Sequence, residues 1–326
     1  MVVQNKKQCI TLGIRLKMGN NFTSFSPLER GRFCPRFSRG NKISRVLMLT
    51  LLIIFSQFLS AQIGNDMLGA RSAALGGYNA TLFDVWSTNN NQGGLGFLEE
   101  MTGGAYYENR FLLSETSYKA GAFVMPVKAG ALGLSVSSFG YELYNETKAG
   151  LSYGQRFGDK FSVGVQLNYL NTKLTQGYGS KTAVTGAIGA IAKLSKEFTL
   201  GVHVYNPSRS KLTNDNNERI PTIMKLGVEY KFSDKVMFVV SSEKDVDFEA
   251  RVNAGIEYHI TEMFYLRGGI STNPTQYAFG AGMQLKHFKV DLSSSFHQTL
   301  GITPAISIVY SKKKHAEKGI AKPGVF

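Results

Sequence analysis

One stretch near the C-terminal end carries the residue types of a hydrolase triad on alternate positions: Asp291, Ser293, Ser295 and His297. In an extended strand these four side chains point to the same face. Neighbours on that face are roughly 7 Å apart, which is too far for the direct hydrogen bonds of a nucleophilic relay. We therefore interpret them as polar side chains on the wall of a hydrated lumen, and we predict no catalytic site.

Two further sets of residues were considered as metal ligands. A loop-like stretch offers the oxygen ligands Asn214, Asp215, Asn217 and Glu218, but it lacks the twelve-residue spacing of a calcium-binding loop. The five histidines show no His-Glu-x-x-His spacing. We interpret the first set as a solvated loop, and the sequence predicts no metal site and no cofactor.

Strands that alternate apolar and polar residues must position these side chains. In residues 161–170 one face is Phe161, Val163, Val165, Leu167 and Tyr169, and the other is Ser162, Gly164, Gln166 and Asn168. Residues 224–232, 251–260 and 288–297 alternate in the same way. The polar faces hold charges and glycines, as a water-filled or plugged lumen would. The predicted lumen-facing residues are Lys225, Glu229, Arg251, Glu257, His259, Asp291 and His297.

Fourteen such runs follow one another between about residues 102 and 311. They lie near Gly103, Tyr118, Leu132, Ala149, Val163, Ile188, Leu200, Leu226, Phe238, Ile256, Leu266, Phe279, Val290 and Ile306. Short connections at 127–131, 157–160, 194–198, 232–235, 260–263 and 286–287 alternate with longer ones at 142–147, 172–181, 206–220, 243–249, 272–276 and 298–301, and a further loop lies near 109–115. A bacterial outer-membrane barrel has this layout, with short periplasmic turns, longer external loops and an even strand number with both termini in the periplasm. The sequence therefore predicts an all-β fold, a transmembrane antiparallel β-barrel of about 14 strands at residues 102–311.

The first 61 residues have the pattern of an export signal. Lys42 and Arg45 precede an apolar run at 46–59, which predicts a cleavable signal peptide with cleavage after Ala61. We interpret residues 1–41 as an over-extended gene start, with a long signal region as the alternative. The predicted location is the outer membrane, reached by export.

Removal of that region changes the charge and the cysteine content of the chain. Residues 1–61 hold 10 of the 37 Lys and Arg and 1 of the 23 Asp and Glu, so the remainder has 27 basic and 22 acidic residues, a net charge of +5 instead of +14. This balance gives no basis for nucleic-acid binding. Cys9 and Cys34 are removed as well, which excludes disulfides and thiolate zinc sites. We interpret the basic tail, 312–326, as a solvated extension, with contact to anionic lipid or a partner as the alternative.

Residues 62–101 do not alternate and are rich in Gly, Ala and Asn. Small residues let a backbone approach a wall closely, and Asn side chains satisfy backbone groups that no strand pairs. We therefore predict an N-terminal plug inside the lumen. Trp86, the only tryptophan, either packs the plug against the wall or contacts a hydrophobic ligand, and packing is the commoner role of a buried aromatic. The candidate plug and gating residues are Arg71, Gly76, Gly77, Asp84, Trp86, Asn89, Asn91, Gln92, Gly93, Gly94 and Leu95.

Three strings in this segment resemble the N-terminal signature of the FadL-like fatty-acid-transporter superfamily of fourteen-stranded outer-membrane barrels. They are residues 69–77 (GARSAALGG), 84–86 (DVW) and 89–95 (NNNQGGL). More closely, they resemble the PorV and PorQ-like proteins of Bacteroidetes, which typically carry an Arg-Ala-x-x-x-Gly-Gly string and then an Asn-Pro-Ala-Gly-Leu-like string. Gln92 and Gly93 stand where that family has Pro and Ala.

The resemblance implies a non-enzymatic barrel in outer-membrane lipid, with one of two functions. The PorV and PorQ-like resemblance implies an accessory of type IX secretion or of surface-protein handling, which works with secretion-system or surface proteins through loops such as 206–220. The wider superfamily implies uptake of a hydrophobic small molecule through the lumen, gated around residues 89–95. The departure at Gln92 and Gly93 favours the first function. An apolar patch on the inner faces of the plug and the neighbouring strands would favour the second.

Overall fold

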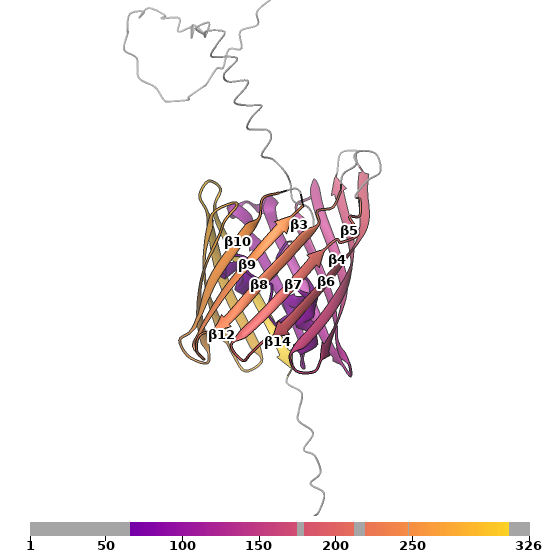
Figure 1. Ribbon diagram of the computed structural model, residues 1–326. Helices are drawn as coiled ribbons and strands as arrows, with labels where there is room; N and C mark the ends of the chain where they lie inside the picture. Colours follow the sequence, from indigo (N-terminus) through magenta and orange to yellow (C-terminus); the bar gives the residue numbers. More distant parts are fainter. Residues whose placement is uncertain (1–65, 175–178, 212–218, 247, 313–326) are drawn as a thin grey trace, which may run out of the picture. The chain divides into compact units, whose positions relative to one another are not determined.

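The computed structural model describes residues 66–174, 179–211, 219–246 and 248–312 of the chain. Within them, fourteen antiparallel strands pair in sequence order, and β1 pairs with β14 to close a barrel (Figure 1). The strands are β1 (Met101–Asn109), β2 (Ser117–Val127), β3 (Gly130–Gly140), β4 (Tyr144–Phe157), β5 (Phe161–Leu174), β6 (Gly179–Lys193), β7 (Phe198–Tyr205), β8 (Ile223–Lys231), β9 (Val236–Asp245), β10 (Arg251–His259), β11 (Phe264–Ser271), β12 (Gln276–Gln284), β13 (Phe288–His297) and β14 (Gly301–Lys312). Each of the fourteen predicted runs lies within one of these strands, in the same order, so the predicted barrel is confirmed.

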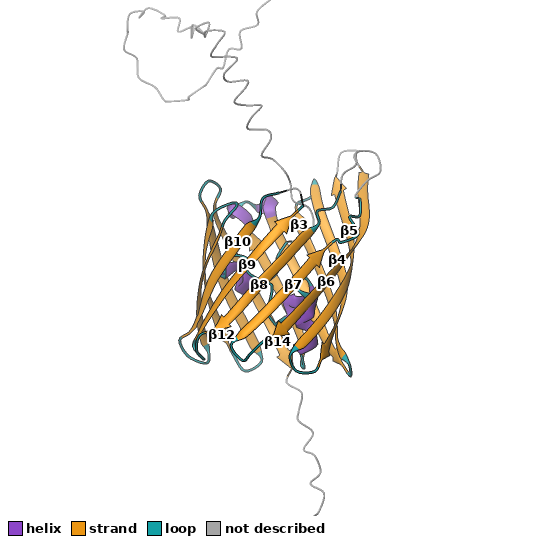
Figure 2. Ribbon diagram, viewed as in Figure 1, coloured by secondary structure: helices purple, strands orange, loops and turns teal. Residues whose placement is uncertain are grey.

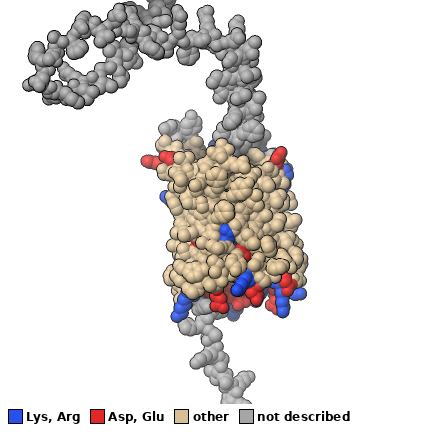
Figure 3. All heavy atoms as spheres, turned by 90° about the vertical axis from the view of Figure 1, so that its left-hand side faces the viewer, with Lys and Arg blue, Asp and Glu red and all other residues tan. Residues whose placement is uncertain are grey.

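The alternation in the sequence corresponds to the two faces of the barrel wall. In β5 the side chains of Val165, Leu167 and Tyr169 point outward and are exposed, whereas Gln166 and Asn168 point into the lumen and are buried. Figure 3 shows that the face of the wall in view carries few charged residues and that most of the charged residues in view lie at the lower rim. An apolar outer face with a polar inner face suits a barrel that is surrounded by lipid.

The two rims differ in their connections. The turn rim, at the bottom of Figure 1, holds the connections 128–129, 158–160, 194–197, 232–235, 260–263 and 285–287. Of the described residues, the loop rim holds 110–116, 141–143, 206–211, 219–222, 246, 248–250, 272–275 and 298–300. Residues 110–116 form two short 3-10 helices, η4 (Arg110–Leu112) and η5 (Ser114–Thr116).

Three predicted long connections were wrong in length, because strands extend into 142–147, 172–181 and 243–249. β4 begins at Tyr144 and β9 ends at Asp245. The polar residues that suggested a loop, such as Asn145 and Lys173, are opposite each other in the β4–β5 ladder. Polar residues near a strand end therefore mark the edge of the lipid-facing band and not the end of the strand.

Aromatic side chains cluster on the outer wall near the turn rim. The rings of Phe198 and Tyr230 lie 4.9 Å apart, and those of Phe288 and Tyr310 lie 5.1 Å apart, between centroids. All four side chains are exposed on the outer surface. Aromatic rings are enriched where a membrane meets water, so this cluster marks one edge of the lipid-facing band.

Residues 66–98, which we call the inner segment, lie inside the barrel (Figure 2). They form the helix α2 (Ala70–Ala74) and the 3-10 helices η2 (Val85–Thr88) and η3 (Gln92–Phe97). Helix α2 contacts β11–β14, and η3 contacts β3–β6, so the segment touches widely separated parts of the wall. No helix in the described residues is long and apolar enough to cross a membrane. The role of the segment as a plug remains a prediction.

Candidate functional site in the barrel lumen

Glycines on the wall bring the inner segment into direct backbone contact with the strands. A Cβ at Gly269 of β11 would collide with the backbone of Gly76, and one at Gly164 of β5 would collide with the backbone of Gln92. Gly76 and Gly77 have φ values of 73° and 92°, a region that glycine adopts without strain. These two residues turn the chain after α2, so that it passes along β11 where no side chain would fit.

Hydrogen bonds from Asn89 and Asn90 hold the start of the inner segment. The Nδ2 group of Asn89 donates a hydrogen bond to the carbonyl of Asp66 (2.8 Å), and its Oδ1 atom accepts one from the ammonium of Lys148 on β4 (2.8 Å). Asn90 accepts a bond from the backbone N–H of Leu68 (2.9 Å) and donates one to the carbonyl of the same residue (2.8 Å). These side-chain amides bond to backbone groups that no strand pairs.

Asn91 and Gln92 join the inner segment to the wall. Asn91 donates to the carbonyl of Val202 on β7 (3.2 Å) and accepts a bond from the N–H of Gly93 (3.0 Å), which caps η3. Gln92 donates from Nε2 to Oε1 of Gln166 on β5 (2.7 Å). Where the family that the sequence resembles has proline, this chain therefore has a side chain bonded to the wall, an interaction that proline lacks.

Trp86 is enclosed by its neighbours. Its side chain is 1% exposed, packs edge-on to Tyr106 of β1 with 5.9 Å between ring centroids, and shares a hydrophobic core with Leu95. Asp84 accepts a bond from the N–H of Trp86 (2.9 Å) and so caps η2. Gly94 is buried within η3, where a side chain would not fit. These are the contacts of a packing residue, one of the two roles considered for Trp86.

A buried ion-pair network joins the inner segment to β10, β11 and β13. The guanidinium of Arg71 donates to both carboxylate oxygens of Glu257, each at 2.8 Å. Arg267 donates to the same carboxylate at 2.6 Å and to Asp291 at 2.6 Å. The side chains of Glu257, Arg267 and Asp291 are 3%, 0% and 3% exposed. A bidentate arginine–carboxylate pair shielded from water fixes geometry as well as charge.

Burial affects the two charged groups of the inner segment in different ways. It works against the positive charge of Arg71, but the attraction and hydrogen bonds of Glu257 outweigh it and raise the pKa of Arg71 above its ordinary value. Burial raises the pKa of Asp84, and the positive charges of Arg71 and Lys289 offset this only in part. Arg71 therefore stays charged, whereas Asp84 takes up a proton more readily than an exposed carboxylate does.

Three more of the predicted lumen residues lie on the inner wall and have partners there. Lys225 lies 3.4 Å from Glu243 across β8 and β9. Glu229 accepts a hydrogen bond from the hydroxyl of Thr81 in the inner segment (2.9 Å). Arg251 donates to a serine hydroxyl of β11 (3.0 Å). The wall thus presents both signs of charge to the inner segment.

The two histidines of the candidate set have different surroundings. His259 lies beside Glu257 on the inner wall, 3.1 Å from its carboxylate. His297 ends β13 at the loop rim, where its Nδ1 atom accepts bonds from two backbone N–H groups of the β13–β14 connection. Asp291 bonds to Arg267 and not to His297, so this face of β13 forms no hydrogen-bonded relay.

Several predictions fall on residues that the structure does not describe. These are the signal region at 1–61, the oxygen-rich stretch at 214–218 and almost all of the tail at 312–326. Within the described residues, no group of three or more His, Cys, Asp and Glu could hold a metal ion.

A cavity of about 680 Å³, which we call the vestibule, lies between the inner segment and the wall at the turn rim. Its apolar surface comes from Leu82, Phe83, Phe232, Val236 and Met237. Charged side chains of both signs line the rest, among them Arg71 and Glu257 of the ion-pair network. A volume of this size lies within the range of small-molecule sites.

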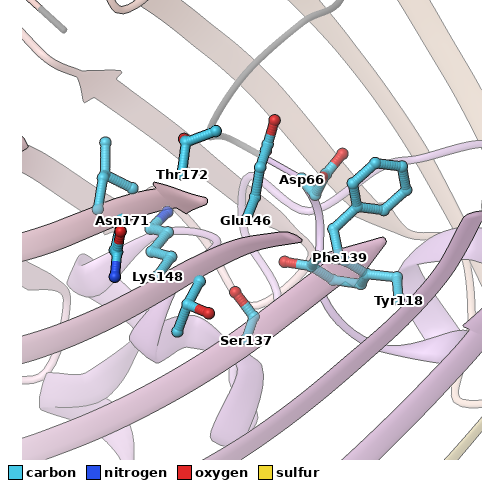
Figure 4. A pocket seen from close by; sticks show the side chains of 10 residues that line it. Asp66, Tyr118, Ser137, Phe139, Glu146, Lys148, Asn171 and Thr172 are labelled. Atoms are coloured by element: carbon cyan, nitrogen blue, oxygen red, sulfur yellow. The ribbon is translucent and has the colours of Figure 1, made fainter. Parts of the chain in front are cut away.

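A second pocket lies at the loop rim beside the start of the inner segment. Asp66, Tyr118, Glu146 and Lys148 are among the residues that line it (Figure 4). Its space of about 20 Å³ holds roughly one water molecule. The vestibule is therefore much the larger of the two spaces, and it faces the turn rim.

Sequence reasoning missed Arg267, which links Glu257 to Asp291. A signal for it was present, because Leu266 points outward in an alternating strand and Arg267 must then point inward. Lys148 was missed as well; it directly follows the predicted connection 142–147, most of which belongs to β4. Both residues are buried; Lys148 bonds to Asn89 in the inner segment, and Arg267 bonds to Glu257, its partner in the β10–β11 ladder.

Comparisons with solved structures find barrels of the same fold. The chain is similar to the CymD monoaromatic hydrocarbon channel (TM-score 0.59, 14% identity, covering 76% of this chain and 98% of that one). It is also similar to the toluene transporter TodX of Pseudomonas putida (TM-score 0.60, 11% identity, covering 78% of this chain and 100% of that one). A third similar structure is a FadL homologue of Pseudomonas aeruginosa (TM-score 0.53, 11% identity, covering 76% of this chain and 99% of that one). At these identities the likeness establishes the fold and leaves the closer PorV and PorQ-like resemblance a prediction. No protein-family model matches the chain, and no curated protein matches it in sequence.

Proposed function

We propose that this protein is an outer-membrane channel for a small hydrophobic molecule, with the inner segment as the partition that the molecule must pass. The observation that carries the proposal is the vestibule, whose apolar surface is formed by the segment and the wall together. The apolar outer wall supports a place in the membrane. Proteins of the same fold include one described as a monoaromatic hydrocarbon channel and one described as a toluene transporter.

Apolar clusters at two levels of the lumen support the same function. One cluster lies near the loop rim, on the inner face of β5–β8 and at the end of the β7–β8 connection. It consists of Leu170, Ala183, Ala187, Tyr205, Ile220 and Ile223. Beside the vestibule, the inner segment and β9 carry Leu75, Tyr78, Ala80, Leu82, Met237 and Val239. Apolar patches on the inner segment and the neighbouring strands are the feature that we expect to favour transport over an accessory role. A molecule that used both would have to displace part of the inner segment.

Ligand binding and uptake test the channel. Trp86 is the only tryptophan and lies in the inner segment, so its fluorescence responds when the segment moves. We expect toluene or a medium-chain fatty acid to give a saturable change with the detergent-solubilised protein. Cells that produce the protein should take up the same compound faster than cells without it. A Trp86→Phe variant controls for optical artefacts, and the absence of both effects for both compounds would refute the channel.

A second function, in type IX secretion or surface-protein handling, is favoured by a different observation. The inner segment is held by a bidentate ion pair and by backbone contacts at glycines, as a permanent filling of the lumen would be. The working surface would then be the loop rim, above all the connection 206–222. Mass spectrometry of everything that copurifies with the gently extracted protein separates the two functions. Secretion-system or surface proteins would favour the accessory role, and a defined hydrophobic molecule would favour the channel.

A further inference from the structure

The chain crosses the lumen of its own barrel from one rim to the other. Its first described residue, Asp66, lies at the loop rim, where its carboxylate is 2.8 Å from the guanidinium of Arg110 in the β1–β2 connection. The crossing ends at the turn rim, where Met101 begins β1 and is paired with Lys312 at the end of β14. Figure 1 shows β14 ending at that lower rim.

The start of the inner segment is held at the loop rim by a cluster of wall residues. Arg110, the partner of Asp66, also bonds to Glu108 of β1 at 2.6 Å. Its guanidinium lies over the rings of Tyr118 and Phe139, 5.3 and 5.1 Å from their centroids. Ion pairing and two cation–π contacts at one guanidinium fix its position, and with it the position of the carboxylate that it binds.

We infer that the two ends of the described chain lie on opposite sides of the membrane, Asp66 at the loop rim and Lys312 at the turn rim. An even number of strands places the start of the first strand and the end of the last strand on the same rim. It does not place the residues before the first strand, which begins at Met101. From that number we predicted both termini in the periplasm. The inner segment changes this result, because it carries the chain through the lumen before the first strand begins.

The consequence is that the inner segment begins beside the loops that face outward in the predicted orientation. With the turn rim in the periplasm, Asp66 lies on the cell-surface side of the barrel, beside Arg110 of the connection 110–116. Strands β1 and β14 pair over eight positions and close the ring around the segment. The segment must therefore be enclosed as these strands pair, or be drawn through the lumen afterwards by its free end.

Cysteine labelling on intact cells tests this arrangement in the full-length protein. Both native cysteines lie in the signal region, so the mature chain provides a blank background. Single cysteines are placed at Asn65→Cys, directly before the inner segment, and at Lys312→Cys, at the end of β14. The reference positions are Glu115→Cys for the loop rim and Asp234→Cys for the turn rim, both exposed. Only variants that migrate as folded barrels without heating are compared.

The readout is the ratio of labelling by a membrane-impermeant maleimide in intact cells to that in permeabilised cells. We expect a ratio close to unity for Asn65→Cys and Glu115→Cys, and a ratio close to zero for Lys312→Cys and Asp234→Cys. A reversal of all four ratios would reverse the barrel but still support opposite chain ends. Agreement of Asn65→Cys with Asp234→Cys would overturn the inference, and so would an Asn65→Cys that is labelled only after denaturation. None of these results depends on whether the protein transports a ligand.

Discussion

Arg71 connects the inner segment to the wall by charge. Its two bonds to Glu257 form where water is excluded, and Glu257 also holds Arg267, so two guanidinium groups share one carboxylate. Removing one member of a buried set leaves the others with charges that are less well compensated. The attachment of the segment therefore depends on a few atoms at the inner end of the vestibule, whereas the barrel ladder does not depend on them.

Replacement of Arg71 should loosen the inner segment and leave the barrel closed. Arg71→Gln removes two charged hydrogen bonds to Glu257, and we expect the segment to lose about 2 kcal/mol of local stability. The measurement is hydrogen exchange of residues 66–98 in the folded barrel, where this loss corresponds to roughly thirtyfold faster opening. Arg156→Gln is the matched control, because it breaks an exposed ion pair with Glu99 and should cost less than about 0.5 kcal/mol. Equal exchange in the two variants would contradict the assigned role of Arg71.

The carboxyl group of Asp84 should make the inner segment sensitive to pH. Its folded pKa is raised above the ordinary 3.8 by burial, so the folded segment binds this proton more tightly than the unfolded one. Its contribution to stability is therefore fully present below the ordinary pKa and is lost as the pH rises through the raised value. We expect Trp86 fluorescence to show a segment that is looser at neutral pH than at mildly acidic pH.

The Asp84→Asn variant isolates that contribution, since it keeps an acceptor for the N–H of Trp86 but does not titrate. The other carboxylates are present in both proteins, so the difference between the two pH profiles reports on Asp84. Identical profiles would show that burial does not shift this group. Asp84→Ala also removes the cap of η2, so at any pH it should be about 1 kcal/mol less stable than Asp84→Asn.

At the scale of the elements, strands were readable from the sequence and contacts of the inner segment were not. Each strand has one face in lipid and one in the lumen, so a period of two appears in runs such as 161–170. The ends of the strands could not be predicted from the sequence. Polar pairs such as Asn145 and Lys173 continue the β4–β5 ladder past the edge of the apolar band, where the alternation of hydropathy stops. The pairs that hold the inner segment, such as Gly76 with Gly269, join residues far apart in the chain, and no local pattern encodes their proximity.

The close approach between α2 and the wall should depend on single glycines of β11. Gly269→Ala places a Cβ against the backbone of Gly76, which cannot move aside without shifting the segment, and overpacking of this kind costs about 2 kcal/mol. Its neighbour Gly268 has only the Ile256 side chain near its Cβ position, at 3.9 Å, so Gly268→Ala should be tolerated. Limited proteolysis of the folded barrels compares the two variants. We expect cleavage within 66–98 for Gly269→Ala only; equal resistance would mean that the glycine contact does not constrain the segment.

At the scale of the whole molecule, the barrel combines an apolar outer surface with a lumen lined by charges. The sequence predicted this arrangement because hydropathy alternates along runs such as 161–170, 224–232 and 288–297. It also predicted which charges face inward, because a charged residue between two outward-facing apolar residues of a strand must point to the lumen. It did not predict that Arg71, Glu257, Arg267 and Asp291 meet. That network depends on strand order around the barrel and on the path of the inner segment, both of which are properties of the closed ring.

The depth of a charge in the membrane provides a test of the whole arrangement. Leu167, in the middle of β5, and Leu194, in the β6–β7 turn, are exposed to nearly the same extent, 61% and 60%. If the outer wall faced water, an arginine at either position would lower the free energy of unfolding only a little. In a bilayer, Leu167→Arg lies near the middle of the lipid-facing band and should cost about 2–4 kcal/mol, whereas Leu194→Arg lies at the rim and should cost about 0–1 kcal/mol. Urea titrations of the two variants refolded into lipid vesicles measure this difference, and equal costs would mean that the outer wall of the barrel does not face lipid.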